Sequence, residues 1–313
     1  MKKSLGSRRS VSRRNFTRTI AMTGIGSVGL PLFGGENTAG SNLFLSFAQG
    51  PLKISLNAYS FDKPLRQGTM SISDLLDYCA MIGFDGVDLT GYYFPGYPAV
   101  PADGFIYEVK RKAFKLGLGI SGTGVKNDFT WSDPAKRAEE KKLVKEWIVV
   151  AEKLGAPLIR IFAGTLSKEA FPWEERLKWI TDDVNECAEY GKNHGVMLAL
   201  QNHNDFIKTA SDVDKIFKIT DPDWVGLLLD IGSYHTPDPY IDIARNAKYA
   251  ISWQLKEKVF VNDTQVDTDY SKIIAIVRQC GFRGFLPLET LGEGDPASKV
   301  EVLFKKVQAV MNV

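Results

Sequence analysis

The chain has 313 residues, with 39 Lys and Arg against 37 Asp and Glu, and a formal net charge of +2. Residues 1–48 hold seven of the basic residues and one of the acidic residues, which leaves 32 basic and 36 acidic side chains after them, a net charge of −4. That remainder has no basic excess for binding phosphate groups, so nucleic acid is excluded as an expected partner.

The first 48 residues show the features of a twin-arginine export signal in the right order. A twin-arginine segment at Ser12–Arg18 is followed by a weakly apolar, Gly-rich run from Ile20 to Phe33. The run is too short to span a bilayer. We therefore expect a periplasmic or otherwise exported protein that is not inserted in a membrane after the signal is removed.

A small-x-small sequence at 46–48 marks the expected cleavage site, after Ala48, and a cut near 38–40 is the alternative. The predicted organisation is a signal peptide and linker at 1–48 and one domain at 49–313. That domain has 265 residues, close to the size of one α/β barrel.

Short apolar runs alternate with helical patterns from residue 52 onward. Eight runs are predicted to be strands, at 52–58, 86–89, 118–121, 158–162, 196–201, 225–230, 249–255 and 284–289. The helical patterns between them begin after capping residues such as Ser71 and Asp133, and several end at a Gly, as at Gly83 and Gly155. They cover 72–82, 107–116, 134–154, 173–194, 211–219, 238–244, 270–280 and 297–311. The polar segment 260–267 lacks periodicity and is predicted to be a loop.

Eight strands alternating with helices predict an α/β fold, a closed (β/α)8 TIM barrel. An open doubly wound sheet is the alternative, but no Gly-rich turn of the dinucleotide type follows the first strand. Cys79, Cys187 and Cys280 are an odd number without CxxC spacing, so we expect buried thiols in helices rather than disulfides.

Polar residues end four of the predicted strands: Gln201, Asp230, Gln254 and Glu289. The carboxyl ends of barrel strands meet at one mouth, so these side chains are expected to converge there. Carboxylate and amide oxygens suit Mg²⁺, Mn²⁺ or Ca²⁺ better than Zn²⁺. The pattern predicts a divalent metal site, although any single one of these residues could equally be a helix cap or the start of a loop.

Other candidate site residues lie near the same strand ends. Lys256 follows the seventh strand and could stabilise enediolate-like charge, and Arg160 in the fourth strand could orient an oxyanion. Both could instead neutralise neighbouring acids. His203 and His235 follow candidate ligand strands and could bind substrate, act as general acid or base, or support other site residues. Asn57 stands at the exit of the first strand as a candidate substrate-binding group.

Four motifs carry a family resemblance: GFDGVDL at 83–89, GVMLALQNH at 195–203, LLLDIG at 227–232 and GFRGFLPLE at 281–289. With them the chain resembles the xylose-isomerase-like sugar isomerase/epimerase family of TIM barrels, from about residue 52 to 310. In that family a divalent ion is held at the ends of strands five to eight by Glu, Asp, His and Glu, and the two Glu act as acid and base.

Carried over by position, the resemblance implies Gln201, Asp230, Gln254 and Glu289 as the metal-binding set. The chain departs from the pattern at two of the four. Gln201 cannot exchange a proton as a carboxylate does, and Gln254 replaces a His, which weakens the expected metal site. Ser233 stands where the family often has a further His.

The leading hypothesis is therefore a metal-assisted isomerase, epimerase or related lyase that moves a proton beside the carbonyl of a sugar or keto-sugar. Glu289 is the remaining acid/base, helped by His203, His235 or Lys256. The alternative is a barrel that binds carbohydrate without turning it over, because Gln201 removes one acid/base. An abasic-site endonuclease of related fold is disfavoured, since such enzymes use a His-rich zinc cluster and the chain has 3 His.

Overall fold

The computed structural model describes residues 52–165 and 171–311, which belong to one compact unit, Ala48–Val313. The expected export signal, its cleavage sites and the domain boundary at 48/49 lie outside the described residues. Within the described part, no helix combines the length and the apolar character needed to cross a membrane.

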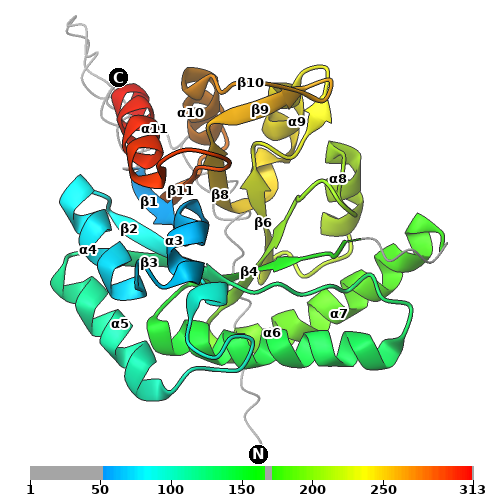
Figure 1. The fold of residues 1–313 in the computed structure, drawn as a ribbon. Coiled ribbons are helices and arrows are strands. Elements are labelled where there is room, and N and C mark those ends of the chain that lie inside the picture. Colours follow the sequence, from blue (N-terminus) through cyan, green and yellow to red (C-terminus); the bar gives the residue numbers. More distant parts are fainter. Residues whose placement is uncertain (1–51, 166–170, 312–313) are drawn as a thin grey trace, which may run out of the picture. The chain divides into compact units, whose positions relative to one another are not determined.

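Eight parallel strands form a closed barrel, as the sequence predicts (Figure 1). Its strand order is β1-β11-β8-β6-β5-β4-β3-β2, so β1 pairs with both β2 and β11 and closes the ring. The strands are β1 Lys53–Asn57, β2 Gly86–Thr90, β3 Gly119–Gly124, β4 Leu158–Phe162, β5 Met197–Gln201, β6 Val225–Asp230, β8 Ala250–Lys256 and β11 Phe285–Glu289.

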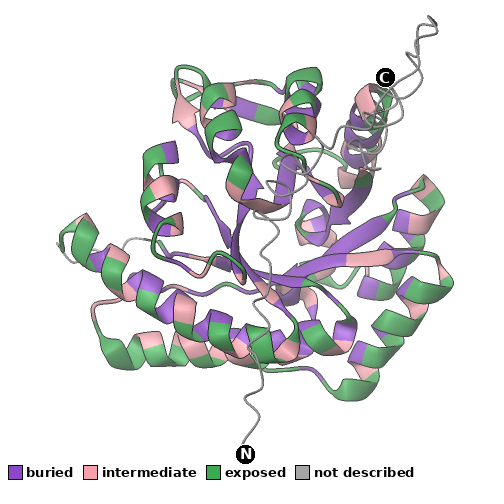
Figure 2. Ribbon diagram, turned by 180° about the vertical axis from the view of Figure 1, so that it is seen from behind, coloured by how far each residue is buried: buried purple, intermediate pink, exposed green. Residues whose placement is uncertain are grey.

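Helices surround the barrel, with buried inner faces and exposed outer faces (Figure 2). They are α3 Asp62–Gln67, α4 Ile72–Ile82, α5 Asp103–Lys115, α6 Pro134–Leu154, α7 Trp173–His194, α8 Ala210–Phe217, α9 Pro239–Asn246, α10 Tyr270–Gln279 and α11 Pro296–Met311. Short 3-10 turns lie at η1 Ala58–Phe61, η2 Gly91–Tyr93 and η3 Ala247–Tyr249. The expected caps are present: Ser71 forms a capping box with Asp74, and Gly155 ends α6 at a φ of 80°.

The interior of the barrel becomes polar toward the carboxyl ends of the strands. Near the amino ends, Phe285 fills the space left by Gly86 and Gly119. Leu158, Ala199 and Leu228 form a small apolar cluster, separate from the main core. Because side chains on a strand alternate between its two faces, the next inward position on most strands is polar. These positions are Asn57, Asp88, Arg160, Gln201, Asp230, Gln254 and Glu289, all of them buried.

The segment predicted to be a loop at 260–267 is instead a β-hairpin. β9 Lys258–Val261 pairs antiparallel with β10 Thr264–Asp267, and β7 His235–Thr236 adds a third strand. Asn262 and Asp263 form the two-residue turn, with φ angles of 47° and 63°. Paired positive φ angles belong to the tight turns that join antiparallel strands, and Asn and Asp tolerate them. The prediction was wrong because this turn signal went unrecognised.

Three smaller differences concern single elements. The helix α3, which follows β1 and η1, was not expected from the sequence. Helix α5 begins at Asp103, four residues before the predicted start. Cys79 and Cys187 are buried free thiols as expected, but Cys280 is exposed, because it lies just beyond the end of α10.

Candidate active site

The carboxyl ends of the barrel strands carry a cluster of four polar side chains, Gln201, Asp230, Lys256 and Glu289, here called the strand-end cluster. Lys256 Nζ donates to Asp230 Oδ2 at 2.7 Å and to Glu289 Oε2 at 3.2 Å. Gln201 Nε2 donates to the same Asp230 oxygen at 2.9 Å. The side chain of Lys256 is 14% exposed, and those of Asp230 and Glu289 are 0% and 6% exposed. An ammonium therefore bridges two buried carboxylates from different strands.

Register explains why Lys256 reaches the cluster. Asp230 of β6 pairs with Gln254 of β8, whereas Glu289 of β11 pairs with Lys256. Gln254 and Lys256 are two residues apart and lie on the same face of β8. The sequence placed Lys256 after the strand, but it is the last residue of β8. The stagger between barrel strands thus brings Lys256, rather than Gln254, level with Glu289.

Backbone and amide groups hold Asp230 in place. The side chain of Asn202 forms two hydrogen bonds with the main chain of Asp230. Asn202 Oδ1 accepts from Asp230 N at 2.8 Å, and Asn202 Nδ2 donates to Asp230 O at 3.0 Å. Gly232 N donates to Asp230 Oδ1 at 2.9 Å. Both carboxylate oxygens of Asp230 therefore already accept hydrogen bonds from the protein.

Electrostatics keep Lys256 charged. Burial opposes the charged ammonium, but the negative charges of Asp230 and Glu289 outweigh it and raise the pKa of Lys256 above its ordinary value. The cluster thus contains one fixed positive charge facing two carboxyl groups.

Sequence reasoning missed Asp88, which lies on β2 among the inward polar positions. Burial raises the pKa of its carboxyl group to about 6, Arg160 opposes that shift, and Glu289 adds to it. Asp88 pairs in register with Asn57 on β1, the strand that separates β2 from β11. Its place inside a predicted strand, one residue before the last, was the available signal, and it differs from the four strand-ending residues.

Arg160 is buried beside this acid rather than open to solvent. Its Nη1 donates to Val125 O at 2.6 Å, and its guanidinium lies 4.1 Å from the ring centre of Phe162 and 5.3 Å from that of Tyr92. Cation–π contacts of this kind hold the planar group in one orientation. The aromatic rings and Arg160 therefore form one wall of the barrel interior next to Asp88.

The remaining predicted residues occupy different places. Asn57 caps η1 by accepting from Tyr59 N at 2.9 Å, which is a structural task. His203 is exposed at the end of β5, with its ring 4.8 Å from Phe162 and its Nδ1 3.2 Å from Asp205. The partners of His203 thus place it beside the aromatic wall.

His235 lies in the small sheet. Its Nδ1 is 2.8 Å from Asp263 Oδ1, and its ring stacks on Phe260 at 3.8 Å. Its contacts are with the β9–β10 hairpin rather than with the strand-end cluster. A role for His235 in proton transfer stays a prediction.

The strand-end residues do not fit a divalent ion in this arrangement. The ammonium of Lys256 lies against both carboxylates that would bind the ion, and Gln201 presents an N–H donor to Asp230 instead of an oxygen. Across residues 52–165 and 171–311, no three His, Cys, Asp or Glu side chains are arranged to hold a metal. The expected set Gln201, Asp230, Gln254 and Glu289 therefore comes to one end of the barrel without forming a metal cage.

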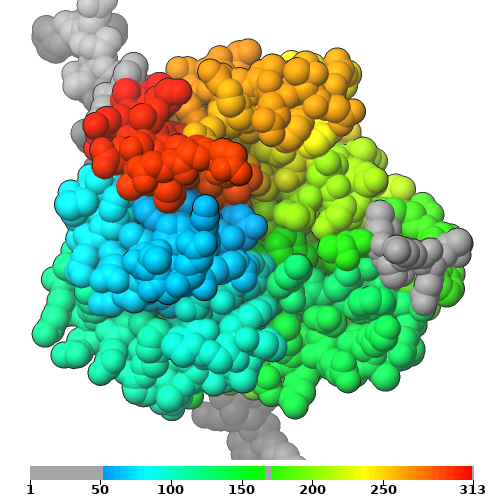
Figure 3. Space-filling model, viewed as in Figure 1, coloured from blue at the N-terminus to red at the C-terminus, as the bar shows by residue number. Residues whose placement is uncertain are grey.

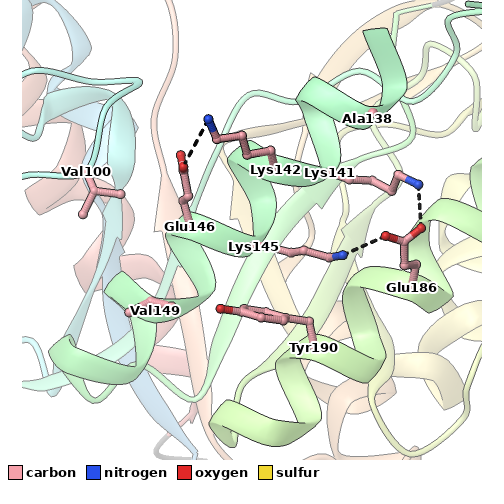
Figure 4. Close-up of a pocket in the computed structure, with 9 residues that line it drawn as sticks. All are labelled: Val100, Ala138, Lys141, Lys142, Lys145, Glu146, Val149, Glu186 and Tyr190. Carbon is pink, nitrogen blue, oxygen red and sulfur yellow. Dashed lines mark hydrogen bonds and ion pairs between the residues drawn. The ribbon is translucent and has the colours of Figure 1, made fainter. Parts of the chain in front are cut away.

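A hollow on the outside of the molecule is lined mainly by residues of α6 and α7. It has a volume of about 510 Å³, and its charged groups pair with one another (Figure 4). Lys141 and Lys145 contact Glu186 at 2.5 and 2.7 Å, and Lys142 contacts Glu146 at 3.8 Å. The strand-end cluster is the better candidate site, because its charges are buried at the carboxyl ends of the barrel strands, where the active sites of such barrels lie. Figure 3 shows blue and red surfaces, from the first and last described parts of the chain, side by side on one face of the molecule.

Comparisons with known proteins agree with the barrel fold. An inosose dehydratase from Geobacillus thermodenitrificans (strain NG80-2) is 22% identical over 270 residues, covering 75% of this chain and 87% of the relative. The crystal structure of an IOLI protein with a bound zinc atom superposes with a TM-score of 0.67 at 16% identity, over 83% of this chain and 97% of that one. The 3-keto-D-glucoside 4-epimerase YcjR from E. coli gives a TM-score of 0.66 at 14% identity, over 83% and 100% of the two chains.

The family model described as "Xylose isomerase-like TIM barrel" matches residues 76–307. This range includes the whole strand-end cluster and every barrel strand except β1. The chain belongs to the xylose isomerase-like TIM barrel family.

Proposed function

We propose that the protein is an isomerase, epimerase or related lyase that moves a proton beside the carbonyl group of a sugar or keto-sugar. The observation that carries the proposal is the buried contact between Lys256 and Glu289 at the strand ends. A carboxylate next to a fixed ammonium can take a proton from carbon while the cation stabilises the charge that develops on oxygen. The names of two relatives, an epimerase of a 3-keto-glucoside and a dehydratase of an inosose, support this reaction class.

Glu289 is proposed as the base because, among the described residues, its side chain forms one ion pair, with Lys256. Asp230 is held by Gln201, Gly232 and Lys256 together, which suits a positioning role. Lys256 would hold the substrate carbonyl oxygen. The metal expected from the sequence takes no part in these steps.

Asp88 and Arg160 supply a second place for proton transfer or orientation. Both are buried on the inner wall, on strands β2 and β4. A carboxyl group with a pKa near 6 can exchange a proton close to neutral pH. This would compensate for Gln201, which cannot act as an acid.

The proposal is tested by proton exchange. The protein is incubated in heavy water with a panel of sugars and keto-sugars, and deuterium at the carbon beside the carbonyl is measured. Glu289→Gln is expected to slow exchange by at least about a hundredfold, because it removes the base while keeping the shape. Glu108→Gln, at an exposed position on α5, is the matched control and should exchange at the wild-type rate.

A barrel that binds carbohydrate without turning it over remains the second candidate, favoured by Gln201 at a position where the family has an acid/base. It predicts sugar binding without any deuterium incorporation. Full exchange activity in Glu289→Gln would instead remove Glu289 from the proposed mechanism.

Export is proposed on the basis of the first 48 residues alone. The mature protein would then act on its sugar outside the cytoplasm. This part of the proposal is independent of the barrel chemistry.

A further inference from the structure

Two buried carboxylates at the strand ends require positive charge. Asp230 and Glu289 are 0% and 4% exposed, and burying carboxylates without compensation is strongly unfavourable. A divalent ion would bring two positive charges, whereas the Lys256 ammonium brings one and contacts both acids. The chain thus already contains a counter-cation at the place where an ion would sit.

We propose that the Lys256 ammonium takes the place of a divalent ion in the strand-end cluster, so that the site works without a metal. Its further role, holding a substrate oxygen, rests on the proposed function. The metal-replacing role does not, and it can be measured without any substrate.

The side chain of Lys256 passes close to the backbone of Gly232, in the turn after β6. A side-chain carbon at Gly232 would lie 2.9 Å from Lys256 Cδ, so any other residue there would force the lysine stem to shift. Gly232 also donates its N–H to Asp230. The same turn therefore admits the lysine and fixes the acid that it contacts.

A neutral Gln201 limits the number of acidic groups at the site to two, which suits one ammonium better than a divalent ion. A carboxylate at this position would give three acids around one lysine, whereas Gln201 leaves two and donates an N–H to Asp230. An ion close to the ammonium would also meet strong repulsion in a buried site. The glutamine at 201 and the lysine at 256 are thus consistent with each other in charge.

The replacement leaves the site with chemistry to perform. Two carboxylates and one ammonium carry a net charge of −1, so Glu289 can accept a proton without giving up a metal. An ammonium has three N–H donors, and the described residues accept from it at Asp230 and Glu289. One donor is left for a substrate oxygen.

The test is a Mn²⁺ titration of the full chain, followed by electron paramagnetic resonance. The wild type is expected to bind no detectable Mn²⁺ at this site. Lys256→Ala is expected to bind one Mn²⁺ per chain, with an affinity at least about tenfold above the detection limit, because it frees two carboxylates. Adding Asp230→Asn to Lys256→Ala should abolish that gain. Lys258→Ala, whose exposed lysine pairs with Asp267 in the hairpin, is the matched control and should bind like the wild type.

The wild type alone keeps the proposal falsifiable if Lys256→Ala fails to fold. One Mn²⁺ per wild-type chain, lost in Asp230→Asn or Glu289→Gln, would overturn it. Deuterium exchange that depends on added Mn²⁺ would also overturn it while leaving the proposed function standing. Absence of exchange on every sugar, with no Mn²⁺ bound by the wild type, would count against the proposed function alone.

Discussion

Asp88 and Glu289 are both buried acids on the inner wall of the barrel, but their surroundings differ. Glu289 contacts the ammonium of Lys256 at 3.2 Å. Asp88 has the guanidinium of Arg160 nearby, and burial outweighs its effect, so the pKa of Asp88 rises from its ordinary 3.8 to about 6. Burial thus brings the pKa of the Asp88 carboxyl group toward neutral pH.

Replacing Asp88 should change how stability depends on pH. Between pH 4 and 6 the folded protein keeps a proton on Asp88 that the unfolded chain releases, so this group favours folding at low pH. Its contribution is lost as pH rises through 6, by up to about 3 kcal/mol. Asp88→Asn should therefore gain stability relative to the wild type from pH 4 to 6 and show a constant difference above that.

Urea unfolding at pH 4, 5, 6 and 7 measures this difference. Asp182→Asn, at an exposed position on α7, is the matched control. Parallel stability profiles of the wild type and Asp88→Asn would show that the burial of Asp88 does not shift its protonation.

The small sheet of β7, β9 and β10 is the clearest addition to the regular alternation of strand and helix. It joins the segment after β6 to the segment after β8 through the pairing of His235 with Phe260. Its turn requires left-handed backbone at Asn262 and Asp263. A β-branched residue tolerates that conformation poorly, whereas glycine adopts it freely.

Asn262→Val is therefore expected to lower the free energy of unfolding by about 1–2 kcal/mol. Asn262→Gly should stay within a few tenths of the wild-type value, because glycine relieves strain but loosens the unfolded chain. Thermal and urea unfolding of the two variants give the comparison. Equal stabilities of the Val and Gly variants would contradict the turn described for β9 and β10.

At the scale of the whole molecule, the charge of the chain is divided between its two parts. The basic residues that make the full chain slightly positive belong to residues 1–48, and the barrel-forming part carries a net −4. The barrel closes through β1 and β11, which are far apart in sequence and pair over four residues each. The proposed export signal and the barrel strands therefore occupy separate stretches of the sequence.

Replacing Arg13 and Arg14 together by Lys is expected to abolish export in a bacterial host with a twin-arginine pathway, while preserving charge. The same exchange at Arg8 and Arg9 is the matched control and should leave export intact. Immunoblots of periplasmic and cytoplasmic fractions give the readout. Unchanged export of the Arg13/Arg14 variant would refute the signal assignment.

Local sequence determined the strands, most helices and the positions of Gln201, Asp230, Gln254 and Glu289, because periodicity and capping act over a few residues. It also identified the family through four short motifs. Tertiary structure alone decided that Lys256 bridges Asp230 and Glu289, that the charge of Arg160 opposes the rise in the pKa of Asp88, and that His235 contacts Asp263. Those contacts depend on the stagger of the barrel strands and on a hairpin turn, which pair residues across elements and leave no periodic trace in the chain.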